Sequence, residues 1–270
     1  MLPRAGLLII PIQAEPKFAS FDLPSEVRKA IAKSGESVQD GDILIISSKY
    51  AAISEGRMVE LSRVVPDEKS RELAKKFNLE ATFAKLVLDE SDTILGGIPG
   101  FVLTVVSGTL APNAGIDRSN VPKGFVVLYP KDAFETVRNL REKLLERPDL
   151  EQKPDKKPLQ KLGIVLSDSR VTPTRLGTVG VAVSFAGIRA TIDMRGTPDL
   201  LGNTLQVTLR AIADQLATAA QLVMGESNEG KPIVIIRGFV EAFREPRNTF
   251  ETKTTISPEQ CLILSSLEAN

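Results

Sequence analysis

Three acidic residues of this 270-residue chain, Asp117, Asp168 and Glu226, stand in short polar stretches beside apolar segments. Asp117 belongs to the run NAGIDRSNVP, Asp168 directly follows the apolar run Leu162–Leu166, and Glu226 lies in the run MGESNEGK. Carboxylates held at the ends of buried elements are common ligands of hard divalent cations. The three residues therefore indicate magnesium- or manganese-assisted phosphoryl transfer, in which charge neutralisation and positioning supply most of the catalysis.

Small hydroxyls and lysines in the same stretches suit phosphate. Ser48 and Lys49 follow an apolar strand, and Lys231 closes the loop that contains Glu226. Each stretch also has a structural interpretation. These are a solvated strand end at 47–49, a long turn at 111–122, an Asx turn or helix cap at Asp168, and an ordinary helix-to-strand loop at 224–231. From these residues alone, both interpretations stay open.

Composition excludes several kinds of chemistry. The chain has no histidine and a single cysteine, Cys261, so histidine-dependent triads and tetrahedral zinc sites are excluded, as is an intrachain disulfide. Lysine plus arginine equals aspartate plus glutamate, at 34 each, which gives no general attraction to nucleic acid or to an anionic membrane. No apolar run is long enough to span a bilayer. We expect a cytoplasmic protein with small-molecule substrates.

The elements that must position these residues follow from hydrophobic periodicity. Strands are predicted at Leu7–Ile12, Ile43–Ser47, Phe101–Val106, Phe125–Leu128, Leu162–Leu166, Val179–Ser184, Ile188–Met194 and Pro232–Ile236, with Met58–Leu61 pairing nearby. Helices are predicted from Pro24 to Lys33, from Pro66 to about Glu90, from Asp132 to Glu146, and from an Asn203 cap to about Met224. The order is mixed α/β (α+β) and too irregular for a doubly wound sheet. Neither GxGxxG nor a Walker loop is present.

The segment 147–158 divides the pattern in two. It holds three prolines, many charges and almost no apolar residues, which predicts an exposed linker. We therefore expect a two-lobed molecule of mixed sheets with packed helices. An N-terminal lobe, 1–146, carries the NAGID loop, and a C-terminal lobe, 159–270, carries the SDS and MGE loops. The two together are expected to form one integrated domain.

The wording of these segments resembles a known family. The runs SSKYAAISEGR, APNAGIDRSNVPKG, IVLSDS, GTVGVAV, DLLGNTLQVT, IADQLATAAQLVMGE and PIVIIRG follow one another from about Ile10 to about Gly238. In this order they are similar to coenzyme F420-0:L-glutamate ligases, also called F420 gamma-glutamyl ligases.

The resemblance implies an intertwined homodimer that joins L-glutamate to coenzyme F420-0 and consumes GTP. It implies two divalent cations, magnesium or manganese, and allows for a monovalent cation besides. The acceptor carboxylate would attack the γ-phosphoryl group, and the glutamate amine would then displace phosphate from the acyl phosphate. No covalent enzyme nucleophile is needed, so a chain without histidine can do this chemistry.

Carried over residue by residue, the resemblance gives Asp117 and Asp168 catalytic roles as metal ligands, with Glu226 as a further ligand. The nucleotide contacts that it implies are Ser48, Lys49, Asn120, Ser169, Met224, Gly225, Glu226, Ser227, Asn228, Glu229, Gly230 and Lys231.

Two positions depart from the family pattern. Ile53 stands where a second lysine is common, and Thr172 stands where the first arginine of a GRxxRxG segment is common, although Arg175 and Gly177 remain. Both changes remove cations that would face phosphate or a substrate carboxylate. Two alternatives therefore accompany the main prediction: a related amide ligase with another acid or amino acid as substrate, and a nucleotide-binding protein without catalysis.

Overall fold

The computed structural model describes residues 6–146, 158–246, 248 and 252–268. Its strands are β1 (Leu8–Ile12), β2 (Asp42–Ser47), β3 (Met58–Glu60), β4 (Thr93–Ile98), β5 (Phe101–Val106), β6 (Thr109–Pro112), β7 (Phe125–Val127), β8 (Leu162–Val171), β9 (Thr178–Ala186), β10 (Thr191–Asp193), β11 (Leu209–Ala211) and β12 (Ile233–Arg237). Its α-helices are α1 (Leu23–Lys33), α2 (Ser48–Ser54), α3 (Glu68–Phe77), α4 (Ala81–Glu90), α5 (Ala133–Leu145), α6 (Ile212–Met224) and α7 (Leu262–Glu268). The mixed α/β class is confirmed.

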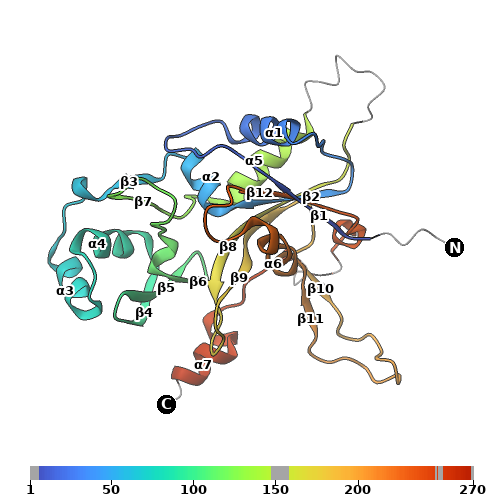
Figure 1. Ribbon diagram of the computed structural model, residues 1–270. Coiled ribbons are helices and arrows are strands. Elements are labelled where there is room, and N and C mark those ends of the chain that lie inside the picture. The colour runs from blue at the N-terminus through green and yellow to red at the C-terminus, as the bar shows by residue number, and fades with distance from the viewer. Residues whose placement is uncertain (1–5, 147–157, 247, 249–251, 269–270) are drawn as a thin grey trace.

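A five-stranded sheet in the order β1-β12-β2-β8-β9 forms the centre of the fold. Only β2 and β8 run parallel, and every other neighbouring pair is antiparallel. Helices α1 and α5 cover one face and α6 covers the other, which makes three layers (Figure 1). The sheet takes strands from both sides of the predicted linker 147–158. All of that linker except Pro158 lies outside the described residues, so the linker stays a prediction.

The central strands are apolar on both faces, as the uninterrupted sequence runs predict. On β2, Leu44 and Ile46 pack toward α1 and α5, whereas Ile43 and Ile45 pack toward α6. Strands β8 and β12 alternate in the same way. Because both faces are filled with apolar side chains, polar groups of these strands can lie only at the strand ends.

Strand direction gathers four chain segments at one edge of this sheet. Ile12 at the end of β1 pairs with Ile233 at the start of β12, Ile233 pairs with Ile46, and Ser47 pairs with Ser167. The segments beyond this row are 13–18, 48–54, 167–171 and 225–232. The backbone hydrogen bond from the Ser47 amide to the Pro232 carbonyl, 2.8 Å long, closes the row.

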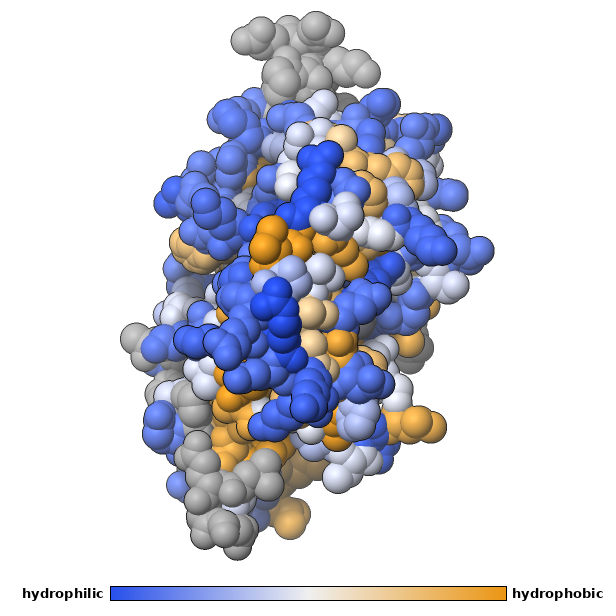
Figure 2. Space-filling model, turned by 90° about the vertical axis from the view of Figure 1, so that its left-hand side faces the viewer, coloured by the Kyte–Doolittle hydropathy of each residue, from blue (hydrophilic) through white to orange (hydrophobic). Residues whose placement is uncertain are grey.

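The segment between α2 and α5 folds into an insert with its own core. It contains the β3–β7 pair, the sheet β4-β5-β6 and the helices α3 and α4, which lie to one side of the central sheet (Figure 1). The surface on this side is largely hydrophilic, with apolar residues exposed in small groups (Figure 2). The insert matters for the site because the NAGID run leaves β6 and returns toward the central sheet.

Two of the predicted helices are wrong in detail. The helix expected from Pro66 to about Glu90 is two helices, because Asn78 adopts a left-handed conformation (φ 52°) that ends α3. The helix expected from Asn203 begins only at Ile212. Asn203 instead lies in a turn where Asp199 accepts its backbone N–H, which favours a hairpin over a helical turn.

Strand β8 is longer than predicted and continues to Val171, so Asp168 lies within the strand and not at its exit. Beyond Ser167, however, β8 loses β2 as a neighbour and pairs only with β9, after a register shift at Leu166. Asp168 therefore lies in the part of β8 that β2 no longer covers. Strands β4, β6 and β11 and helices α2 and α7 were not predicted. No helix in the described parts of the chain is long and apolar enough to cross a membrane.

Close packing of α6 on the sheet gives a stability prediction. A Cβ on Gly180 of β9 would lie 2.5 Å from the Ala217 carbonyl oxygen on α6, and backbone at that distance must shift. We expect Gly180→Ala to lower the free energy of unfolding by about 1–3 kcal/mol in urea titrations. Gly6→Ala is the control, because its Cβ would meet nothing within 4 Å. Equal stability of the two variants would contradict the close approach.

Candidate functional site

A cavity of about 590 Å³ opens at the sheet edge where the four segments meet. It is lined by Ala14, Glu15, Pro16, Lys17, Phe18, Ser47, Lys49, Tyr50, Ile53, Asp117, Ser119, Asn120, Val121, Pro122, Ser167, Asp168, Ser169, Gln221 and the run Met224–Pro232. Every predicted site residue except Ser48 is in this wall. Residues that are far apart in the sequence are thus brought to one cavity.

The NAGID run carries Asp117 to the cavity through a strained turn. Asn113 accepts the Val102 backbone N–H at 2.8 Å, which fixes the start of the turn. Ala114 has a left-handed backbone (φ 56°), which is uncommon for a residue with a side chain. The Gly115 backbone packs against the Tyr129 ring, and a Cβ on Gly115 would lie 2.6 Å from a ring carbon. The motif is therefore mainly a device that positions Asp117.

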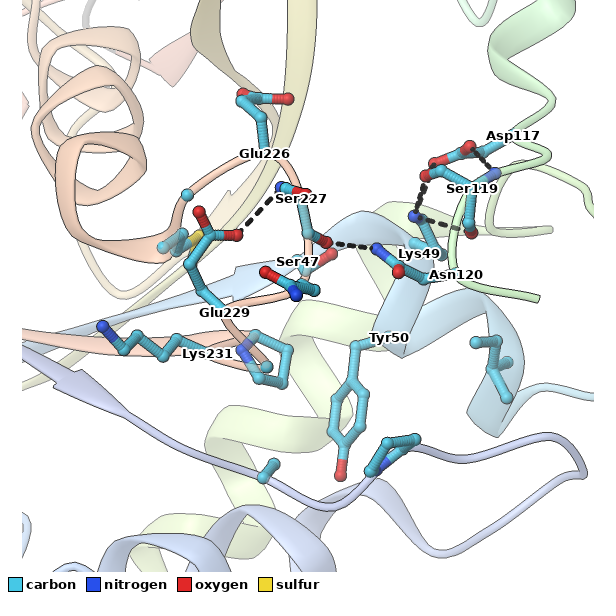
Figure 3. Close-up of a pocket in the computed structure, with 18 of the residues that line it drawn as sticks. Ser47, Lys49, Tyr50, Asp117, Ser119, Asn120, Glu226, Ser227, Glu229 and Lys231 are labelled. Carbon is cyan, nitrogen blue, oxygen red and sulfur yellow. Dashed lines mark hydrogen bonds and ion pairs between the residues drawn. The ribbon is translucent and has the colours of Figure 1, made fainter.

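Asp117 and Lys49 form an ion pair inside the cavity (Figure 3). The Lys49 ammonium lies 2.7 Å from Asp117 Oδ2 and also donates to the Ser119 hydroxyl at 2.6 Å. Burial raises the pKa of Asp117, but the charge and hydrogen bond of Lys49, with hydrogen bonds from Ser119, outweigh it and lower that pKa. Asp117 is therefore held as a carboxylate with a protein cation as its counter-ion.

Asp168 shows the opposite shift. Burial raises its pKa, although the Arg170 guanidinium at 3.1 Å, the Ser169 backbone and the Ser48 hydroxyl favour the charged form. The nearby Asp117 carboxylate adds to the upward shift. Ser48 is buried and outside the cavity wall, so the structure places its hydroxyl behind Asp168.

Arg170 links the two parts of the molecule behind Asp168. Its guanidinium donates to the Tyr129 hydroxyl at 2.6 Å and to the Leu110 carbonyl at 3.0 Å, both in the insert. Arg170 is buried with these partners and is not part of the cavity wall. It therefore supports Asp168 from inside the protein and does not replace the arginine that the family commonly has where this chain has Thr172. Thr172 is not in the cavity wall either.

Glu226 lies across the cavity from Asp117 (Figure 3). Its carboxylate accepts hydrogen bonds from the Ser169 hydroxyl at 2.9 Å and from the Gln221 amide. Among the residues that the structure describes, no three acidic side chains converge closely enough to form a ready metal site. The pair Asp117 and Asp168 still suits magnesium or manganese, because these ions need only one or two protein carboxylates when phosphate oxygens complete the shell.

The loop 225–231 folds around the carboxylate of Glu229, one of its own residues. Gly225 adopts φ 77°, and a Cβ there would lie 2.1 Å from the Glu229 carboxyl carbon. The pKa of the Glu229 carboxyl is lowered by a hydrogen bond from its own backbone N–H and by one from the Ser227 backbone N–H at 2.8 Å. Asn120 donates to the Ser227 carbonyl at 2.6 Å, so it bridges this loop to the NAGID run (Figure 3). A phosphate bound by this loop would replace the Glu229 carboxylate at the amides.

The cavity wall is net negative. It holds five acidic side chains, Glu15, Asp117, Asp168, Glu226 and Glu229, against three lysines, Lys17, Lys49 and Lys231. Of these lysines, Lys49 pairs with Asp117 and Lys17 pairs with Glu26 at 2.7 Å. An anionic ligand therefore meets an excess of negative charge unless cations accompany it.

Sequence reasoning missed a second group of wall residues. Segment 14–18 lines the cavity, together with Tyr50, Ile53 and Val121. Segment 14–18 follows a strand that ends at the same edge as β2, which local periodicity does not reveal. Tyr50, Ile53 and Val121 lie in runs that the sequence analysis singled out, but among these three only Ile53 was discussed individually, as a departure from the family pattern.

The two carboxylates predict opposite effects on stability. Asp117→Asn should lower the unfolding free energy at pH 7.5, because a lowered pKa means that the fold favours the charged form. Asp168→Asn should raise it, because a raised pKa means that the fold disfavours the charge. Each unit of pKa shift corresponds to about 1.4 kcal/mol.

Urea unfolding in EDTA at several pH values measures both effects. As pH falls from 7.5, the gain from Asp168→Asn should shrink first, as wild-type Asp168 takes up its proton. The loss from Asp117→Asn should persist until the pH drops below the ordinary range of an aspartate. Shifts of the same sign in both variants would contradict this arrangement.

Comparisons with known proteins identify the family of this chain. A family model described as F420-0:Gamma-glutamyl ligase matches residues 18–238. A coenzyme F420:L-glutamate ligase of Methanopyrus kandleri is 34% identical over 245 residues, which cover 89% of this chain and 92% of the relative. One of Methanocaldococcus jannaschii is 36% identical over 202 residues, which cover 74% and 77%. This chain therefore belongs to the F420-0:gamma-glutamyl ligase family.

Proposed function

We propose that this protein is an enzyme that joins L-glutamate to coenzyme F420-0, with GTP as the phosphoryl donor and magnesium or manganese as the required cation. Family membership supports glutamate ligation. The observation that carries the nucleotide and metal is the cavity itself. It holds Asp117 and Asp168 near each other, has an excess of acidic side chains, and still ends in a glycine-containing loop with a lysine.

The charge balance explains why cations are needed. A nucleoside triphosphate is strongly anionic, and the wall already carries two more acidic side chains than lysines. Divalent cations bound to Asp117, Asp168 and phosphate oxygens would neutralise the charge that develops on the transferred phosphoryl group. A cation at Asp117 would also release Lys49, whose ammonium could then contact phosphate oxygens.

We propose an acyl-phosphate mechanism for this reaction. An acceptor carboxylate oxygen attacks the γ-phosphorus, the bond to the bridging oxygen breaks, and GDP leaves. The glutamate amine then attacks the acyl carbon, phosphate leaves, and the amine loses its proton. In both steps the protein orients reactants and stabilises charge, so no side chain forms a covalent bond to substrate.

A second candidate is a related amide ligase that uses another carboxylic acid. Ile53 favours it, because the position where the family commonly has a lysine is buried and packs with Val127 and Val121 at the cavity. An acceptor with an anionic group at this point would meet no cation there.

The direct test is a ligation assay. Wild-type protein with GTP, Mg²⁺ or Mn²⁺, glutamate and F420-0 should give the glutamylated product by mass spectrometry, and EDTA should abolish it. Asp168→Asn should lower the rate at least about a hundredfold while leaving the circular dichroism spectrum unchanged. Asp89→Asn, an exposed carboxylate of α4, is the control and should keep the rate.

Two outcomes would overturn parts of this proposal. Product formed without any divalent cation would remove the metal requirement. Phosphate release that is stimulated by another carboxylic acid but not by F420-0 would favour the second candidate.

We further propose a homodimer. The β10–β11 hairpin extends away from the body of the molecule (Figure 1) and exposes Leu200, Leu201 and Val207 almost completely. At its tip, the Asp199 carboxylate accepts the backbone N–H groups of Leu201 and Asn203, both at 2.8 Å. Apolar side chains exposed on a projecting hairpin are typical of a surface that another subunit covers.

Light scattering after size exclusion tests the dimer. Wild-type protein should have twice the mass of the chain, and the double variant Leu200→Glu and Leu201→Glu should have the mass of one chain. Val65→Glu, an equally exposed apolar position in the insert, is the control. A monomeric wild-type protein would contradict the proposal.

A further inference from the structure

Tyr129 contacts both chain segments that carry the predicted metal ligands. On one side, its ring packs against the Gly115 backbone in the NAGID run, two residues before Asp117. On the other side, its hydroxyl accepts a hydrogen bond from Arg170, whose guanidinium lies 3.1 Å from Asp168 Oδ2. We propose that Tyr129 and Arg170 are positioning residues that set the separation of the two carboxylates. The inference rests on the proposed function, in which these carboxylates hold the divalent cation.

The insert holds Tyr129 in place through its backbone as well as through its ring. Arg57, the last residue of the run SSKYAAISEGR, donates from Nε to the Tyr129 carbonyl at 3.0 Å and pairs with Glu90 of α4. The Leu128 amide donates in turn to the Arg57 carbonyl at 3.0 Å. The Tyr129 side chain is buried in the apolar core of the insert, which also contains Ala114 of the NAGID run. Tyr129 is therefore a fixed point between the segments on its two sides.

Arg170 is suited to hold a carboxylate and a second partner at once. Its planar guanidinium donates in fixed directions, and it contacts Asp168, the Tyr129 hydroxyl at 2.6 Å and the Leu110 carbonyl at 3.0 Å. Its Nε is buried without a hydrogen-bond partner among the described residues. Burial of a charged group with an unpaired N–H costs stability, and an apolar contact between insert and sheet would avoid that cost. The arrangement therefore indicates a role at Asp168 beyond joining these two parts.

The two carboxylates come from different parts of the molecule. Asp117 lies in the insert, between β6 and β7, and Asp168 lies in β8 of the central sheet. Both line the same cavity, and the charge of Asp117 contributes to the raised pKa of Asp168. Magnesium requires nearly octahedral coordination at about 2.0–2.1 Å. A shift of the insert against the sheet would therefore weaken a cation that is bound to both.

Helix α2 also reaches both carboxylates, through Lys49 at Asp117 and Ser48 at Asp168. Under the proposed function, a cation at Asp117 displaces Lys49, so this link is lost when the cation binds. The contact between Tyr129 and Arg170 lies outside the cavity wall, where no ligand replaces it. It is therefore the link between insert and sheet that persists in the loaded site.

Calorimetric titration with Mn²⁺ in the presence of GDP tests this role. Tyr129→Phe keeps the ring against Gly115 but removes the acceptor of Arg170. We expect the Kd of Mn²⁺ to rise about tenfold, at the lower end of the effect of residues that support metal ligands. Arg170→Lys should act in the same direction, because one ammonium does not reproduce the planar fork. The ligation rate of both variants should fall at limiting Mn²⁺ and recover at excess Mn²⁺.

Ser70→Ala is the matched control. The Ser70 hydroxyl is buried in the insert and donates to the Asp67 carbonyl at 2.8 Å, at the start of α3. Urea titrations should show a loss of stability in Ser70→Ala, while its Kd for Mn²⁺ stays that of the wild type. An unchanged Kd in Tyr129→Phe would overturn the inference. An equal rise in Ser70→Ala and Tyr129→Phe would also do so, because Tyr129 would then only support the fold.

The behaviour of the wild-type protein decides the proposed function separately. If it ligates F420-0 and Tyr129→Phe binds Mn²⁺ equally well, only the positioning role is wrong. If it binds Mn²⁺ but forms no product from F420-0, the substrate assignment falls, and the Mn²⁺ titrations still decide the positioning role. If it binds no Mn²⁺, the metal assignment and the positioning role fall together.

Discussion

Burial of the central sheet on both faces is the constraint on which the rest of the molecule depends. Strands β2, β8 and β12 fill one apolar core toward α1 and α5 and another toward α6. Polar groups on these strands would be costly anywhere except at the ends. Since Ile233 pairs with Ile46, and the next residue, Ser47, pairs with Ser167, the segments that follow or precede these residues must meet at the same edge. The cavity is the consequence of that row.

Electrostatics in the cavity follow from placing acidic groups close together at this edge. Asp117 keeps its charge because Lys49 neutralises it, whereas Asp168 is pushed toward its neutral form by burial and by Asp117. Glu229 turns back onto the amides of its own loop in a similar way. Under the proposed function, cations and phosphate would contact the same carboxylates and amides. Ligand binding would exchange these internal partners for external ones.

The insert and segment 14–18 make this edge a particular site. The insert delivers Asp117 through a turn that Asn113 and Gly115 allow, and Arg170 anchors it to β8 behind Asp168. Segment 14–18 lines the same cavity, together with Ile53. Ile53, a departure from the family pattern, thus lies in the same wall as Asp117 and Asp168.

The sequence by itself determined the mixed α/β class, the buried strands and nearly all of the polar residues in the cavity wall, because polar residues beside long apolar runs must lie where the runs end. It did not determine the break at Asn78 or the helix start at Ile212, where one turn conformation overrides an apolar periodicity. Only the tertiary structure decided that Lys49 pairs with Asp117, that Ser48 lies behind Asp168, and that Phe18 shares their cavity. These contacts depend on strand order and direction, which the local pattern of residues does not encode.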